Sequence, residues 1–128
     1  MQTKKVALAY DAIAPDNSEI RELVDVSEAS MVHCTLPVGA VSLTVSHVSV
    51  DEMWYVLSGK GKLWRSKPGT PQSMVINLEP GLAISIERST HFQFKNTGKE
   101  ALTLVIATIP PWPGEDDAIR EKDFWVIH

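Results

Sequence analysis

His47 and Glu52 are the two side chains of this sequence whose types and spacing could perform chemistry. Apolar residues alternate with Ser and Thr over residues 41–47, which is typical of a half-buried strand and places His47 on the apolar face. Residues 52–57 predict the next strand, and residues 58–61 (SGKG) predict a glycine-rich hairpin turn. An imidazole and a carboxylate beside a buried face each need a partner. They are either a hydrogen-bonded pair without further function or the polar anchor of a ligand or metal.

Short apolar-polar segments separated by Pro, Gly and Asn turns run through most of the chain. They predict strands over residues 5–10, 19–25, 31–36, 62–65, 73–78, 82–86, 91–96 and 102–109. Residues 19–25 could also form a helical turn, and a strand is favoured. No segment keeps a helical period over three turns, so the pattern predicts an all-β sandwich or barrel.

Residues 110–128 are expected to form an extended C-terminal arm, because PPWPG lacks the backbone donors that a central strand needs. The arm carries Trp112 and Trp125, and we expect it either to pack back over the barrel or to cover a partner subunit. The whole chain, residues 1–128, is expected to be one domain. Its core barrel covers about residues 30–109, with N-terminal strands in residues 1–29.

The composition excludes several classes of function. The 128 residues have a net charge of −4 and scattered basic side chains, which argues against nucleic acid and anionic membranes as partners. No apolar run is long enough to span a bilayer, and the N-terminus lacks the features of a signal peptide. The single cysteine, Cys34, suits a reducing cytoplasm and lies in an apolar run, which favours a buried structural role. We therefore expect a cytoplasmic protein.

Two segments of the chain resemble the two conserved motifs of the cupins, a jelly-roll superfamily. The first motif, G(X)5HXH(X)4E(X)6G, matches the spacing of Gly39, Val45, His47, Glu52 and Gly59. The second, G(X)5PXG(X)2H(X)3N, matches the spacing of residues 81, 87, 89, 92 and 96. The resemblance implies an all-β, double-stranded β-helix (jelly-roll) barrel of short antiparallel strands, with the arm added at its C-terminus.

In metal-dependent cupins the motif His, His, Glu and His side chains converge on a transition metal. This chain keeps His47 and Glu52 at those positions, but has Val45 and Phe92 in place of the other two ligands. Two protein ligands hold a transition metal poorly. His91 could supply a third ligand only through a register slip, which would expose Phe92 and Phe94 and bury Lys95, or through a local bulge. A weakly bound divalent transition metal at His47, Glu52 and His91 is the one cofactor that remains open.

The favoured function is therefore that of a small-molecule-binding cupin without a strong metal site. Its ligand, not identifiable from the sequence, would occupy an apolar cavity in which Val45, Trp54, Phe92 and Phe94 form the pocket, together with Val41 and Leu43, around His47 and Glu52. The alternative is an enzyme in which His47 and Glu52 are catalytic. That enzyme is either a metal-dependent isomerase, epimerase or oxygenase with His91 as third ligand, or a metal-free epimerase with His47 as base. The sequence shows no second acid–base group opposite His47.

A third interpretation is an interaction protein that uses its arm and its outer sheet surface. Met53 and Tyr55 face away from Glu52, and such side chains are typical of interfaces, so we expect a homodimer. Alternation does not decide whether Trp64 or Arg65 faces inward. An inward arginine would indicate a carboxylate or phosphate partner.

Overall fold

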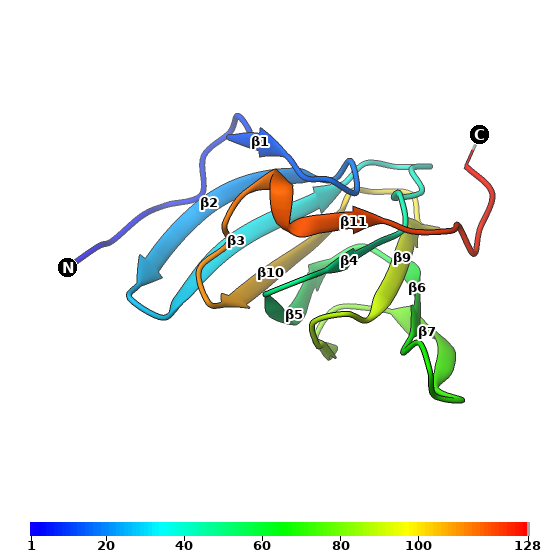
Figure 1. The fold of residues 1–128 in the computed structure, drawn as a ribbon. Coiled ribbons are helices and arrows are strands. Elements are labelled where there is room, and N and C mark those ends of the chain that lie inside the picture. The colour runs from blue at the N-terminus through cyan, green and yellow to red at the C-terminus, as the bar shows by residue number, and fades with distance from the viewer. Residues whose placement is uncertain (128) are drawn as a thin grey trace.

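The computed structural model describes residues 1–127, apart from the side chain of Glu115. These residues form two antiparallel sheets that pack face to face, which confirms the all-β jelly-roll prediction (Figure 1). The six-stranded sheet contains, in spatial order, β1 (Ala12–Ile13), β2 (Glu19–Val26), β3 (Ala29–Leu36), β10 (Leu102–Ile109), β5 (Asp51–Ser58) and β8 (Ala83–Ile86). The five-stranded sheet contains β11 (Ala118–Arg120), β4 (Val45–His47), β9 (His91–Asn96), β6 (Gly61–Ser66) and β7 (Ser73–Leu78). Among the described residues there is no helix long and apolar enough to cross a membrane.

The core fills the space between the sheets with the inward side chains of alternating strand positions. In β9 the inward residues are Phe92 and Phe94, which are almost completely buried, so the register without a slip is confirmed. Cys34 is also buried in this core, and burial raises the pKa of its thiol well above the usual value, as expected for a structural cysteine.

The predicted hairpin after residue 57 is wrong. Strand β5 pairs with β10 and β8, whereas β6 pairs with β9 and β7, so residues 58–61 carry the chain from one sheet to the other. The glycine at position 59 is required there, because its φ is +86° and a Cβ atom would lie 2.6 Å from the carbonyl oxygen of Ala101. The glycines at positions 59 and 61 therefore mark the point where the chain crosses from one sheet to the other.

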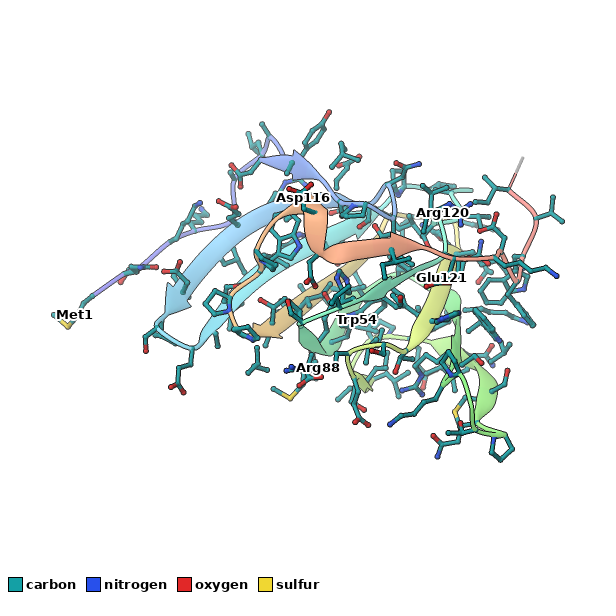
Figure 2. All side chains as sticks on the ribbon, in the orientation of Figure 1. Met1, Trp54, Arg88, Asp116, Arg120 and Glu121 are labelled. Carbon is teal, nitrogen blue, oxygen red and sulfur yellow. The ribbon has the colours of Figure 1, made fainter. Side chains whose placement is uncertain are left out.

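The N-terminal end of the chain also differs from the prediction. Residues 19–25 do form a strand, β2, but residues 5–10 do not. The segment is held beside β2 by side chains, since the Arg21 guanidinium donates to the carbonyl oxygens of Ala7 and Leu8. Met1 lies at the end of this segment, well away from both sheets (Figure 2).

The strand predicted for residues 41–47 is shorter in the structure, where β4 covers only residues 45–47. Its hydroxyl-bearing face is not exposed, because the C-terminal arm covers it: Thr44 Oγ1 donates to Asp123 and Ser46 Oγ donates to Glu121. Val41 and Leu43 are only half-buried. The prediction that the apolar positions of this segment face the core is therefore confirmed only for its last residues, Val45 and His47.

The arm packs back over its own barrel instead of hanging free. After a short 3-10 helix, η1 (Glu115–Asp117), β11 pairs with β4, and the chain then continues past β9 (Figure 1). Phe124 stacks on Trp64, with ring centroids 4.9 Å apart, so Trp64 is on the outer face of β6. Arg65, the next residue, is on the inner face with Leu63, near the C-terminal end of β6.

Candidate functional site

His47 and Glu52 come from opposite sheets and meet between them. His47 is the last residue of β4, and Glu52 is the second residue of β5, after a loop of Val48–Val50. Both side chains are buried, each with 7% residual exposure. His47 Nε2 lies 3.6 Å from Glu52 Oε2, which is an ion-pair distance but longer than an ordinary hydrogen bond. The structure thus brings the two predicted residues together.

Glu52 is a carboxyl group in an apolar setting. Its one hydrogen bond within the described part of the chain is to the indole of Trp54, whose Nε1 donates to Oε1 at 3.0 Å. Burial raises the pKa of Glu52, and the neighbouring His47 and the Trp54 bond oppose this only in part. The site therefore contains an acid that is easier to protonate than an exposed glutamate.

Asp117 approaches His47 from the other side, and the sequence alone did not indicate it. Its Oδ2 lies 3.5 Å from His47 Nδ1, close enough to pair with a protonated imidazole, and Nδ1 has no hydrogen-bond partner among the described residues. The antiparallel pairing of Ala118 with His47 sets this position, and Ser49 donates to Asp117 from its hydroxyl group. The only sequence signal was the acidic run after PPWPG, which we placed in the extended C-terminal arm without a role in the site.

Asp16 is a second acid that sequence reasoning missed, because it lies in a polar turn before β2. Its side chain is buried, with 7% residual exposure, and its Oδ1 accepts hydrogen bonds from Ser18 N at 2.9 Å and from Ser18 Oγ at 2.6 Å. Burial raises the pKa of Asp16, and the hydrogen bonds from Ser18, which lower it, offset this only in part. Three ionisable side chains therefore line one small volume, Asp16, His47 and Glu52, and Asp117 lies next to it, 3.5 Å from His47.

That volume is a cavity of about 30 Å³, enough for one or two water molecules. Of the predicted pocket residues, Val45, Trp54 and Phe92 line it, whereas Phe94 lies behind Trp54, with ring centroids 5.0 Å apart. None of the described residues lining the cavity is a lysine or an arginine. The full lining consists of Ala14, Pro15, Asp16, Ser18, Ile20, Val32, Val45, His47, Glu52, Trp54, Phe92, Ile106, Thr108 and Trp112.

The residues present do not fit a tightly held transition metal. Among the residues whose side chains the structure describes, no three His, Cys, Asp or Glu side chains lie close enough together to hold a metal ion. His91 is not part of the cavity lining; its Nε2 lies 3.5 Å from Glu121 Oε1 of the arm, on the outer face of the sheet. Val45 and Phe92 place hydrocarbon where two further ligands would have to be.

Two antiparallel sheets enclosing a cavity between the inner faces define the class of small jelly-roll barrels. The Cupin domain family model matches residues 32–108, more than half of the chain. The chain therefore belongs to the cupin family.

The relatives of the chain differ in what is known about them. It is 28% identical to the uncharacterized protein MJ1618 of Methanocaldococcus jannaschii, over 92% of this chain and 97% of that protein. Its fold is similar to that of a Lactobacillus farciminis oxalate decarboxylase solved as a formate complex (TM-score 0.69, 16% identity, 80% of this chain and 31% of that chain). It is also similar to the Drosophila melanogaster CENP-C cupin domain (TM-score 0.63, 14% identity, 71% of this chain and 68% of that chain). Since the fold is shared by an enzyme and by a domain named only for its fold, the likeness does not determine function.

Proposed function

We propose that the protein binds a small molecule in the cavity between its sheets, with His47 and Glu52 as the polar contacts. The supporting observation is that Glu52 is buried with one hydrogen bond and with His47 at 3.6 Å. Burying an ionisable group without full compensation costs free energy. A ligand group that bonded both His47 and Glu52 would supply the missing compensation.

The charges around the cavity indicate the class of ligand. Asp16 and Glu52 line the cavity and Asp117 lies 3.5 Å from His47, which is the one basic side chain among the described lining residues. This balance favours a ligand with hydrogen-bond donors, such as a hydroxyl group or a protonated amine, and disfavours an anion. A ligand larger than one or two waters needs part of the cavity lining to move outward.

Metal-free acid–base catalysis is a second candidate, and the position of Asp117 favours it. A carboxylate facing His47 Nδ1 at 3.5 Å would hold the imidazole in one tautomer and leave Nε2 free to accept a proton. Asp16, across the cavity, would be the second acid–base group. In this case His47 takes a proton from a bound substrate, and a carboxyl group returns one.

The binding proposal can be tested by two-dimensional NMR with a set of small amines, polyols and carboxylates. A ligand should shift the indole N–H resonance of Trp54, because this group bonds Glu52. Glu52→Gln should weaken binding about tenfold, the effect of losing one charge-assisted hydrogen bond. Asp51→Asn is the matched control, since the neighbouring Asp51 is exposed and paired with Arg88. If both variants bind equally, or no compound shifts Trp54, the proposal fails.

The metal-dependent alternative, with His47, Glu52 and a third ligand such as His91, has its own test. Elemental mass spectrometry of protein purified without chelators should give well under one metal ion per chain. Near-stoichiometric metal in the wild type that is lost in His47→Ala would mean that a third ligand completes the site, and would make a metal enzyme the leading function.

We also propose that the protein is a homodimer that pairs through the outer face of the six-stranded sheet. Met53, Tyr55 and Leu57 of β5 are each about half exposed there, whereas the arm covers much of the other outer face. A light-scattering mass of two chains in the wild type and of one chain in Tyr55→Glu is expected. A monomeric wild type would contradict the proposal.

A further inference from the structure

A second hollow lies at the edge of the sandwich, away from His47. Strands β6 and β7 of one sheet and β8 of the other border it, and β7 and β8 are the last strands of their sheets. Its volume is about 160 Å³, enough for several water molecules. Its lining is mostly polar and carries two basic side chains, Arg65 and Lys67, and one acidic side chain, Glu87.

Arg65 differs from the other three arginines of the chain in its partners. The guanidinium groups of the others each lie within 4 Å of a carboxylate: Arg21 with Glu19, Arg88 with Asp51 and Arg120 with Asp123. For Arg65, no described carboxylate lies within that distance.

The hydrogen bonds of Arg65 leave much of its guanidinium unused. One donor of Nη1 bonds the carbonyl oxygen of Ser85 on the edge strand β8, at 2.8 Å. Among the described residues, Nη2 bonds only the sulfur of Met74, at 3.6 Å, and the buried Nε has no hydrogen-bond partner. Burial lowers the pKa of Arg65, which is the effect of holding a positive charge away from water without a counter-charge.

We propose that this hollow binds a small oxyanion, a carboxylate or a phosphate group, through the guanidinium of Arg65. A guanidinium that lacks an oxygen acceptor on Nη2 presents the donors that such anions bind most strongly. Lys67 adds a second positive charge at the rim, where its Nζ lies 3.7 Å from the carboxylate of Glu87 and both side chains are largely exposed. The hydroxyl groups of Ser66 and Thr90 supply neutral donors.

This site has the opposite charge preference to the cavity at His47, so the two proposals are independent. An anion is disfavoured beside Asp16 and Glu52 and favoured beside Arg65. A molecule carrying an acidic group would therefore bind at the edge of the sandwich, and not between the sheets.

The test is a titration of the full chain with sodium phosphate, and separately with sodium acetate, at constant ionic strength set by sodium chloride. The Nε–H resonance of Arg65 should shift and saturate with at least one of the two anions, and which one does so identifies the class. Arg65→Met should remove the saturable shifts of the backbone amides around Ser66 and Ser85. Arg88→Met is the matched control, because Arg88 is exposed and already paired.

Arg65 could instead serve only as a clamp between the two sheet edges. In that case Arg65→Met lowers the melting temperature, but neither anion raises the melting temperature of the wild type above the chloride control, and this result overturns the proposal. The Lys67→Gln variant, changed at an exposed position, should fold normally and bind the anion severalfold more weakly. Glu52→Gln should leave anion binding unchanged, which separates this test from that of the proposed function.

Discussion

The two faces of the five-stranded sheet differ in how fully their buried polar groups are hydrogen-bonded. On the outer face, Gln93 of β9 is completely buried under the arm and makes four hydrogen bonds. Its amide donates to the carbonyl oxygens of Ser42 and Trp125, and its oxygen accepts from the backbone of Phe124 and Trp125. On the inner face, His47 of β4 lies 3.5–3.6 Å from two carboxylates, and its Nδ1 has no hydrogen bond to any residue that the structure describes.

The difference separates a structural network from a candidate site. Buried polar groups that the chain itself satisfies hold segments in place, and here they attach the arm to the barrel. Buried ionisable groups that the chain leaves incompletely bonded cost stability, and function is the usual reason for keeping them. Changes on the outer face should therefore destabilise the protein, whereas a change on the inner face can stabilise it.

Replacing Gln93 should have the largest effect on stability. Gln93→Leu leaves two carbonyl oxygens and two N–H groups without their partner, so we expect the free energy of unfolding to fall by about 2–4 kcal/mol. Urea unfolding measures this loss, and limited proteolysis should cut first within residues 110–127, where the arm is released.

Lys95→Met is the control for that experiment. Lys95 also contacts the arm, with Nζ 4.6 Å from the centre of the Trp125 ring, but its ammonium can remain in water. The loss should be below about 1 kcal/mol. Equal losses in the two variants would mean that Gln93 does not hold the arm.

Much of the barrel could be predicted from the sequence, because period-two alternation reports directly which side chains face the core. The inward Phe92 and the proximity of His47 and Glu52 both followed from spacing in this way. Alternation does not report what covers the other face. It therefore gave no warning that Gln93 would be as buried as the phenylalanines beside it.

Asp16 and Asp117 could not have been predicted for a related reason. Asp16 lies in a turn and Asp117 in the short 3-10 helix η1, where no strand periodicity applies. Their positions depend on contacts distant in the sequence: Asp117 is placed by the pairing of β11 with β4. The hairpin error has the same origin, since a turn near Gly59 specifies a reversal but not the sheet in which the next strand pairs. Local pattern predicted the walls of the site and one of its three acids, Glu52, and it missed the other two, Asp16 and Asp117.

Glu52→Gln tests the inner face, and here we expect the substitution to raise the free energy of unfolding, whereas Gln93→Leu lowers it. Because burial raises the pKa of Glu52, the folded wild type loses stability as pH rises from the unfolded value, near 4.5, through the folded pKa. The amide keeps an oxygen for the Trp54 bond and carries no charge. We expect the variant to be more stable than the wild type by about 1 kcal/mol at pH 8, with no advantage at pH 4.

Thermal unfolding at the two pH values measures this difference. Asp51→Asn at the neighbouring exposed position should show no gain at pH 8, because Arg88 already pairs with that carboxylate and lowers its pKa. If Glu52→Gln is less stable than the wild type at pH 8, the interaction with His47 outweighs burial, and the pair is structural.

Asp123 on the arm should show the smallest effect and the reverse pH dependence. Arg120 donates to both of its carboxylate oxygens, at 2.8 and 2.9 Å, and lowers the pKa of Asp123 to about 2. Its stabilisation is therefore complete above the unfolded pKa of 3.8 and is lost as pH falls towards 2. Since the pair is partly exposed, Asp123→Asn should cost only about 0.5–1 kcal/mol at pH 7.

The difference between wild type and Asp123→Asn should shrink between pH 4 and pH 2, when followed by urea unfolding. Asp116→Asn removes the same charge from an exposed position of the same arm, and should change stability by less than about 0.5 kcal/mol at pH 7. A constant difference down to pH 2 would mean that Thr44, which also donates to Asp123, holds the arm without help from the charge. The outer face would then depend on neutral hydrogen bonds alone, and its contrast with the ionisable inner face would be sharper still.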